Sequence, residues 1–169
     1  MTLDEARDRL TRAARSNITD VHIVGGLIDE LDLAWYESLM RLCKELLPSA
    51  LVQGMTAVEI ACLARREGLP LGDVFHRLAA AGLDAISGGG AEIFNQDVRA
   101  RICKEKISAD QWLGVHRAAH EIGMHTNATM LFGHLESSED IIDHLTRLRD
   151  LQDSTGGFEA LVPLPFHPA

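Results

Sequence analysis

Short apolar runs alternate with longer amphipathic stretches along the whole chain. The runs are bounded by Gly, Thr or Pro and are too short for buried helices, so they are predicted to be strands. They fall at residues 21–24, 51–55, 84–87, 126–131 and 158–164. Because strands joined by helices form right-handed crossover units, we predict a parallel sheet whose helices cover one face or both.

Hydroxyl residues stand where the helices between these runs would begin. In a capping box, a hydroxyl and a carboxylate or amide three residues later satisfy backbone amide donors reciprocally. The pattern occurs at Thr2 and Glu5, Thr56 and Glu59, Ser108 and Gln111, and more loosely at Ser137 and Asp140. Apolar residues then recur at helical spacing, which predicts helices with one buried face. They include Trp112, Val115, Ala119 and Ile122 in one helix and Ile141, Leu145 and Leu148 in the next.

The number of strands limits the architecture. Five crossover units favour a barrel-like wrap, but a closed (β/α)8 barrel has eight strands and about 250 residues. This chain has 169 residues and begins on a helix. We therefore expect one α/β domain, residues 1–169, folded as part of a TIM-like barrel of parallel strands. Its outermost strands would expose unpaired backbone, which predicts a covering segment or pairing with another chain, such as a homo-oligomer.

The composition narrows the class of ligand. The chain is 46% hydrophobic, enough for a sizeable core, and its formal charge of -9 disfavours nucleic acid because no basic face is available. A small-molecule substrate fits better. No apolar run approaches the roughly 20 residues of a membrane span, and the first residues lack an export signal, so we expect a cytoplasmic protein.

The cysteines do not form a recognisable metal motif. Cys43, Cys62 and Cys103 are odd in number and far apart, which predicts three reduced thiols. No Cys-x-x-x-Cys-x-x-Cys occurs in the chain. Cys43 and Cys62 lie in helical apolar patterns, where a free cysteine behaves as a small buried hydrophobe.

Glycines and polar residues follow several predicted strands. Gly25 and Gly26 end the first strand, although a glycine pair alone is more often a simple turn. A run from Ser87 through three glycines leads to Glu92, which could hold ribose hydroxyls. The spacing matches neither a P-loop nor Gly-x-Gly-x-x-Gly. A second such segment, residues 127–136, follows the next predicted strand. Since the carboxyl ends of parallel strands meet at one edge of the sheet, residues 87–94 and 127–136 predict a shared pocket.

Two histidine-containing segments are further candidates. His116 and His120 could share a metal, but no Glu follows His116 as in His-Glu-x-x-His, so solvated or capping histidines are favoured. His134 and Glu136 lie nearer a strand end and are better placed for chemistry. Glu136 could instead complement the amino end of the next helix.

Strand alternation sends Asn127 and Thr129 to one face of the fourth strand. In a barrel these side chains would point inward, where binding a ligand and hydrogen-bonding within the core are equally plausible. His167, beyond the last strand, lies on the same rim if the sheet is parallel.

Taken together, these segments resemble the radical S-adenosylmethionine enzymes of the futalosine route to menaquinone. The resemblance runs nearly from end to end. Among the parts that carry it are His22-Ile23-Val24-Gly25-Gly26-Leu27 and Pro163-Leu164-Pro165-Phe166-His167-Pro168, although the Gly-Gly pair alone is a weak signal. The specific combination is the run Gly88-Gly89-Gly90-Ala91-Glu92-Ile93-Phe94, the segment Asn127-Ala128-Thr129-Met130 within residues 127–136, and the ending Phe166-His167-Pro168. The synthases and the cyclases of that route are both similar, and Ile102-Cys103, His116 and Phe166-His167-Pro168 favour the synthases.

This resemblance implies an incomplete TIM-like (β/α)6 barrel, a six-stranded partial barrel to which the chain contributes the parallel strands two to six. It also implies S-adenosylmethionine as cofactor, with a [4Fe–4S] cluster, and a radical addition to 3-[(1-carboxyvinyl)oxy]benzoate. The implied cofactor contacts are Gly25, Gly26, Ser87, Glu92, Gly133 and Glu136. The implied substrate contacts are His22, Asn127, Thr129 and His167. Arg99, Arg101 and Arg117 could each bind a substrate carboxylate.

The family holds its cluster by three cysteines in a loop after the first barrel strand, and Cys43, Cys62 and Cys103 do not have that spacing. We therefore expect the 169 residues alone neither to assemble a cluster nor to turn over. Two other hypotheses stay open. The chain could be a non-catalytic binding or assembly module that pairs through its outer strands, or a metal-dependent hydrolase using His116, His120, His134 and Glu136.

Overall fold

All five predicted strands are present and form one parallel sheet in sequential order. They are β1 (Asp20–Ile23), β2 (Leu51–Thr56), β3 (Ala85–Ser87), β4 (His125–Phe132) and β5 (Phe158–Pro165). The computed structural model describes residues 1–167, so Pro168 of the predicted Phe-His-Pro ending lies outside the described residues. Sequential parallel order is that of an opened (β/α) barrel, so the predicted fold class is confirmed.

Seven helices connect and flank the strands in the described part of the chain. They are α1 (Leu3–Ala13), α2 (Leu33–Leu46), α3 (Ala57–Glu67), α4 (Leu71–Ala81), α5 (Gln96–Ile102), α6 (Ala109–Glu121) and α7 (Ser138–Thr155). The four predicted capping boxes are all formed, at the starts of α1, α3, α6 and α7. None of the helices within residues 1–167 is long and apolar enough to cross a membrane.

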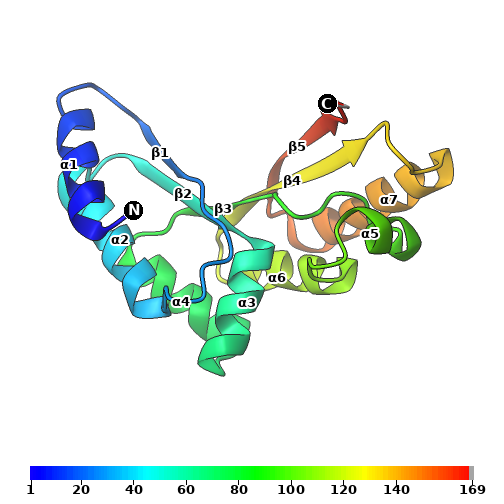
Figure 1. The fold of residues 1–169 in the computed structure, drawn as a ribbon, viewed down its shortest axis with the longest axis horizontal. Coiled ribbons are helices and arrows are strands. Elements are labelled where there is room, and N and C mark those ends of the chain that lie inside the picture. The colour runs from blue at the N-terminus through cyan, green and yellow to red at the C-terminus, as the bar shows by residue number, and fades with distance from the viewer. Residues whose placement is uncertain (168–169) are drawn as a thin grey trace.

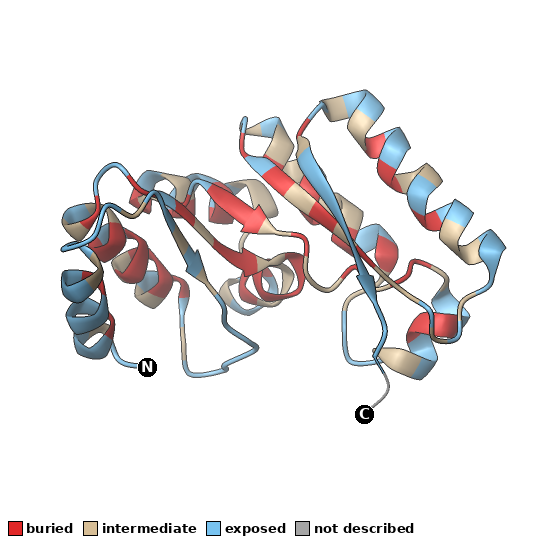
Figure 2. Cartoon of the chain, turned by 90° about the horizontal axis from the view of Figure 1, so that it is seen from above, coloured by how far each residue is buried: buried red, intermediate tan, exposed pale blue. Residues whose placement is uncertain are grey.

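The helices gather on one side of the sheet and leave its other side bare (Figure 1). The core lies between the helices and the central strands, where Val52, Ile86 and Trp112 are completely buried. Burying an aliphatic or aromatic side chain of this size stabilises the fold by about 1.5–3 kcal/mol. The outer strands differ, because β1 and β5 are largely exposed (Figure 2).

The uncovered side of the sheet is called the open face. In β4 the residues Thr126, Ala128 and Met130 are buried against the helices, while Asn127 and Thr129 alternate with them and are half-buried. The predicted inward orientation of Asn127 and Thr129 is therefore confirmed. Strand register also pairs His22 of β1 with Gln53 of β2 on this face.

A bulge interrupts β2 near its carboxyl end. Gln53 pairs with Ala85 but Thr56 pairs with Ser87, so β2 uses one more residue than β3 over this interval. Met55 takes a left-handed backbone conformation, with φ of 62°, and its side chain joins the main core. The bulge thus brings Thr56, which caps α3, level with the end of β3.

One predicted core position is wrong. The helical stripe places Leu145 on the buried face of α7, but it is 38% exposed, and the buried residues of that helix are His144, Leu148 and Leu151. Leu145 lies over the outer side of β5 in a groove that it shares with Leu161. The reason is geometric, since no further helix within the described residues packs against this edge of the sheet.

Candidate functional site

A cavity of about 570 Å³ opens at the carboxyl ends of the central strands, as predicted, and is called the rim pocket. Its wall combines apolar and polar side chains from the ends of α5 and β4 and from the segments that follow β3, α5, β4 and β5. They include Glu92, Ile102, Lys106, Leu131, His134, Leu135 and Phe166. Ligand pockets typically occupy 300–1,000 Å³ and combine apolar walls with a few polar groups, and the rim pocket meets both criteria.

Glu92 is the strained residue of this pocket. Its φ is 48°, a left-handed conformation that a residue with a side chain adopts at a cost of about 1 kcal/mol. Its Oε1 pairs with Lys106 Nζ at 2.5 Å, and its carbonyl accepts a hydrogen bond from Leu131 N. A strained backbone persists only where the surrounding structure imposes it, and such residues are concentrated at functional sites.

The three glycines before Glu92 are required by packing. A Cβ on Gly88 would lie 2.5 Å from the carbonyl oxygen of Asn127, and one on Gly90 would overlap the side chain of Val58. Gly89 is similarly close to Thr56. The run therefore allows β3 to end directly against β4 and α3. The Ser87 hydroxyl is also engaged, because it donates to the carbonyl of Met55 at 3.0 Å.

Arg99 fixes the glycine segment after β3 by hydrogen bonds from its side chain to backbone carbonyls. Its guanidinium is buried and donates to the carbonyls of Gly90, Ala91, Ile93 and Ile107. All of these are backbone acceptors of the surrounding loops, so the interpretation of Arg99 as a substrate-carboxylate ligand is wrong. Arg101 and Arg117, the other two candidates, have exposed side chains and do not line the rim pocket.

Glu136 closes the turn after β4. Its carboxylate accepts hydrogen bonds from the backbone N–H groups of Gly133 and His134, and it lies 2.9 Å from Nδ1 of His134. Burial raises the pKa of Glu136, but the backbone hydrogen bonds and the neighbouring imidazole outweigh it, so the pKa is lowered overall. The carboxylate is therefore ionised and fixes the turn. Gly133 at its corner has φ of 89°, which favours glycine.

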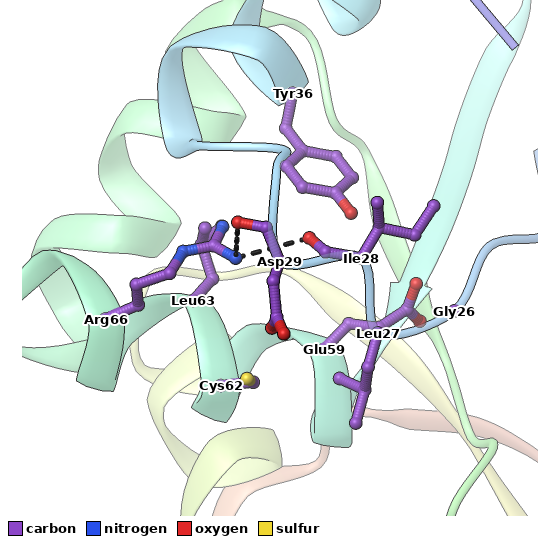
Figure 3. A pocket seen from close by; sticks show the side chains of 9 residues that line it. All are labelled: Gly26, Leu27, Ile28, Asp29, Tyr36, Glu59, Cys62, Leu63 and Arg66. Atoms are coloured by element: carbon purple, nitrogen blue, oxygen red, sulfur yellow. Dashed lines mark hydrogen bonds between the residues drawn. The ribbon is translucent and has the colours of Figure 1, made fainter.

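The segment after β1 forms a second, much smaller cavity of about 10 Å³ (Figure 3). Gly26, Tyr36 and Glu59 contribute to its wall, and Arg66 donates from one side to the carbonyls of Ile28 and Asp29. This volume holds about one water molecule or one small ligand group.

The two glycines of this segment differ. A Cβ on Gly25 would lie 2.8 Å from Oε1 of Glu59, whereas nothing lies within 4 Å of a Cβ on Gly26. Gly25 therefore allows the loop to approach α3 closely, and Gly26 leaves its backbone open.

The predicted substrate residues lie on or beside the open face, and they differ in whether their side chains already make hydrogen bonds within the protein. The Thr129 hydroxyl donates to the carbonyl of Gly88 at 2.6 Å and so serves the structure. Asn127 has no side-chain hydrogen bond within residues 1–167 and stays available to a ligand. His22 and His167 are exposed. Sequence reasoning missed Gln53, which the alternation after Val52 could have placed beside His22.

His116 and His120 form a buried polar cluster with two threonines. Thr126 Oγ1 lies 2.9 Å from Nδ1 of His116 and 2.8 Å from Nε2 of His120, whose Nδ1 lies 2.7 Å from Thr155. Burial lowers the pKa of His116 to about 3 and that of His120 to about 4. Because His116 is fully buried, the prediction of a solvated or capping histidine is wrong for it.

The cysteines do not fit an iron–sulfur cluster. Cys43 lies in α2, Cys62 in α3 and Cys103 just after α5, so they belong to separate elements. Burial raises the pKa of the Cys43 and Cys103 thiols, which opposes the thiolate form that metals require. Within residues 1–167 no group of three or more His, Cys, Asp or Glu side chains could hold a metal ion. No step of chemistry is therefore assigned to a cluster.

Comparison with known proteins gives this geometry a context. The sequence profile of the Radical SAM superfamily matches residues 1–148. The chain is 44% identical over 166 residues to aminodeoxyfutalosine synthase of Thermus thermophilus, covering 98% of this chain and 45% of that protein. It is 40% identical over the same length, with the same coverages, to 5-amino-6-(D-ribitylamino)uracil–L-tyrosine 4-hydroxyphenyl transferase of Methanopyrus kandleri. The chain thus spans a little under half the length of these relatives.

Solved structures show the same fold. The crystal structure of Streptococcus suis SuiB matches with a TM-score of 0.64 at 15% identity, covering 98% of this chain and 34% of that one. The cobalamin-dependent S-adenosylmethionine radical enzyme OxsB matches with a TM-score of 0.61, also at 15% identity, covering 96% of this chain and 24% of that one. The sheet described here therefore has the arrangement of a radical SAM partial barrel.

Proposed function

This chain belongs to the radical SAM superfamily, and from that premise we propose that it is the cofactor- and substrate-binding part of an aminofutalosine synthase in menaquinone biosynthesis. The observation that carries the proposal is the 44% identity to aminodeoxyfutalosine synthase over nearly the whole chain. The rim pocket, at the carboxyl ends of the strands, supports it because ligands of (β/α) barrels bind at that edge.

In this proposal the two glycine segments bind opposite ends of S-adenosylmethionine. The open backbone at Gly26, next to the closely packed Gly25, binds the amino-acid end, and Glu92 binds the ribose hydroxyls in the rim pocket. The volume of about 570 Å³ is large enough for a nucleoside. Lys106 now occupies Oε1 of Glu92, so the ribose would share or displace that contact.

Bound S-adenosylmethionine would supply the radical chemistry, since its one-electron reduction gives methionine and a 5′-deoxyadenosyl radical that can add to the enol-ether double bond of 3-[(1-carboxyvinyl)oxy]benzoate. The electron would come from a donor other than the cysteines of this chain. The chain's own residues position and shield that reaction, since the cofactor carries the difficult chemistry. Asn127 and His22 on the open face are the side chains available to orient the substrate, with His167 at the rim. Gln53 joins them because it pairs with His22 on the same face.

A second candidate comes from the 40% identity to the ribitylaminouracil–tyrosine transferase. That relative matches the same 166 residues, and the binding groups on the open face do not by themselves separate the two substrates. The two functions differ in the ligand expected there, which is an aryl carboxylate for the synthase and a ribitylaminouracil for the transferase.

Calorimetric titration of the purified chain tests both parts of the proposal. The first titrant is S-adenosylhomocysteine, and the resulting complex is then titrated with 3-[(1-carboxyvinyl)oxy]benzoate or with 5-amino-6-(D-ribitylamino)uracil. Of these two ligands, we expect only the benzoate to bind the complex. Asn127→Ala should weaken benzoate binding more than the exposed control His125→Ala does. Binding of the uracil alone would favour the transferase, and a chain that binds no nucleoside ligand would refute the proposal.

A further inference from the structure

Lys106 provides a positive charge in the wall of the rim pocket. Among the described residues that line this cavity it is the one lysine or arginine, and its side chain is 41% exposed, so a ligand in the pocket can reach the ammonium. The three arginines predicted as carboxylate ligands do not replace it, because Arg99 is engaged with backbone carbonyls and Arg101 and Arg117 do not line the pocket. A chain with a formal charge of -9 needs such a local cation to hold an anionic ligand.

The place of Lys106 is fixed at both ends of the residue. Its backbone N–H donates to the carbonyl of Cys103 at 2.9 Å, in the segment that joins α5 to α6. The next residue, Ile107, is held through its carbonyl by the buried guanidinium of Arg99. At the other end, the ammonium donates to Oε1 of Glu92 at 2.5 Å. The positive charge therefore has a defined position in the pocket wall.

The ion pair leaves hydrogen-bonding groups unused on both partners. An ammonium carries three N–H donors, and that of Lys106 uses one of them within residues 1–167. Oε2 of Glu92 likewise accepts no hydrogen bond from the described residues. The carboxylate can thus bind a ribose hydroxyl through Oε2 while Oε1 holds Lys106, and Lys106 has two donors left for a second ligand.

The position beside Glu92 determines which anionic group Lys106 can meet. Under the proposed function Glu92 binds the ribose of the cofactor, and the reacting 5′ carbon is attached to that ribose. The double bond under attack has to lie about 3–3.5 Å from this carbon. Of the two carboxylates of 3-[(1-carboxyvinyl)oxy]benzoate, one is bonded directly to the double bond and the other lies across the aromatic ring. The carboxylate on the double bond is therefore the one within reach of a cation next to the ribose.

We propose that Lys106 binds the carboxylate of the carboxyvinyl group and so places the double bond beside the ribose. Glu92 has two roles in this arrangement, because one of its oxygens binds the ribose and the other positions Lys106. The inference rests on the proposed function, which supplies both the cofactor and the benzoate. It adds to that function a residue that sets the orientation of the substrate.

The test uses three ligands that differ in their carboxylates. They are the full substrate, 3-(vinyloxy)benzoate, which lacks the carboxylate on the double bond, and 2-phenoxyacrylate, which lacks the ring carboxylate. Each is titrated by calorimetry into the chain saturated with S-adenosylhomocysteine. In the wild type, removing the carboxylate on the double bond should weaken binding by at least about tenfold, as expected when a hydrogen bond between charged groups is lost. Removing the ring carboxylate should weaken it less, and the reverse order would overturn the inference.

Two variants assign the effect to one residue. Lys106→Met keeps an unbranched apolar side chain but has no ammonium, so it should bind the full substrate and 3-(vinyloxy)benzoate equally well. Lys104→Met is the matched control, because Lys104 belongs to the same segment, is 77% exposed and does not line the rim pocket. It should keep the preference for the full substrate. A preference that persists in Lys106→Met, or disappears in Lys104→Met, would contradict the assignment.

Reductive methylation of the wild-type chain gives a readout that does not depend on any variant folding. Mass spectrometry follows the rates at which the amines of Lys106 and Lys104 are methylated. Adding the full substrate to the complex with S-adenosylhomocysteine should slow methylation at Lys106 and leave Lys104 unchanged.

Two outcomes of this measurement would overturn the inference alone. One is a bound substrate that gives Lys106 no further protection. The other is protection by S-adenosylhomocysteine but not by 5′-methylthioadenosine, which would assign Lys106 to the carboxylate of the cofactor. If the complex does not bind the full substrate at all, the proposed function fails together with the inference.

Discussion

Two loops that follow strands are each held by one arginine, but the two arginines work in different surroundings. In the first loop, residues 24–32, the exposed Arg66 donates to the carbonyls of Ile28, Asp29 and Leu31. In the second loop, residues 88–95, Arg99 donates to the carbonyl of Ala91, and it also donates to the neighbouring carbonyl of Ile107. Unlike Arg66, Arg99 is only 6% exposed. The same chemistry thus secures one loop in water and the other in the core.

The difference shows that a count of hydrogen bonds does not measure what a residue contributes. If Arg66 is removed, water can replace it at the carbonyls, so little is lost. If Arg99 is removed, buried carbonyls are left without donors, and the full desolvation penalty remains. We therefore expect the second loop to be a rigid part of the fold and the first loop to adapt to its ligand.

The largest expected effect comes from truncating each arginine. Arg99→Ala should lower the free energy of unfolding by about 3 kcal/mol, and Arg66→Ala by less than about 1 kcal/mol, as measured by urea denaturation. Arg101→Ala, exposed on the same helix as Arg99, is the control and should be nearly neutral. Equal losses at Arg99 and Arg66 would show that burial does not separate the two loops.

The next largest difference between the two loops should appear when a glycine in each is replaced by alanine and the stability of the two variants is compared. Gly88→Ala brings a Cβ to 2.5 Å from the carbonyl oxygen of Asn127 in β4, and overpacking of this kind costs about 2 kcal/mol. Gly26→Ala meets nothing within 4 Å and should change stability by less than about 0.5 kcal/mol. Thermal unfolding of the pair measures this, and a destabilised Gly26→Ala would mean that the first loop is also tightly packed.

Acid should weaken the second loop selectively, because its support contains a neutral histidine. Trp112 donates to the carbonyl of Gly89 and packs on His116, with 3.8 Å between ring centroids. Burial lowers the pKa of His116 from 6.5 to about 3, so the unfolded chain binds a proton that the folded chain excludes. The resulting stability is complete above pH 6.5 and is lost as the pH falls toward 3.

The expected contribution of His116 is up to about 1.4 kcal/mol per pH unit in that interval. His116→Gln should therefore reduce the slope of unfolding free energy against pH between about 6 and about 4 by up to that amount, whatever it does to stability at neutral pH. Part of the slope should stay, because burial also lowers the pKa of His120 and of His144 to about 4. His76→Gln, at an exposed position, should keep the wild-type slope. An unchanged slope in His116→Gln would contradict the assignment.

The smallest expected effect is a gain. Glu92→Gly removes the side chain from a residue with φ of 48° and should raise the free energy of unfolding by about 0.5 kcal/mol, since glycine adopts this conformation without strain. The same variant should bind S-adenosylhomocysteine more weakly in calorimetry, because the carboxylate is lost. A variant that is stabilised and still binds normally would remove Glu92 from the proposed site.

Local patterns predicted the framework well because they depend on short-range physics. The capping box at Thr56 and Glu59 and the alternation at Asn127 and Thr129 can each be read within a few residues, and both are confirmed. The pocket at the strand ends was also predictable, because parallel strands end at a common edge.

Long-range contacts were not predictable in the same way. Nothing near Arg99 in the sequence indicates that its guanidinium turns inward to the carbonyls of Gly90 and Ile107. His116 likewise depends on Thr126, which meets it only when α6 packs on β4.

The bulge at Met55 also constrains how β2 can vary in length. Strand residues face opposite sides in turn, and the additional residue at the bulge reverses the sides of the residues after it. This reversal lets Met55 enter the core and Thr56 pair with Ser87. A deletion of one residue here would restore strict alternation and so exchange the surroundings of both side chains. Inserting or deleting two residues would leave every side chain on its present side of the sheet. Whether β2 has an odd or an even number of residues is therefore a property of this fold that no single substitution would reveal.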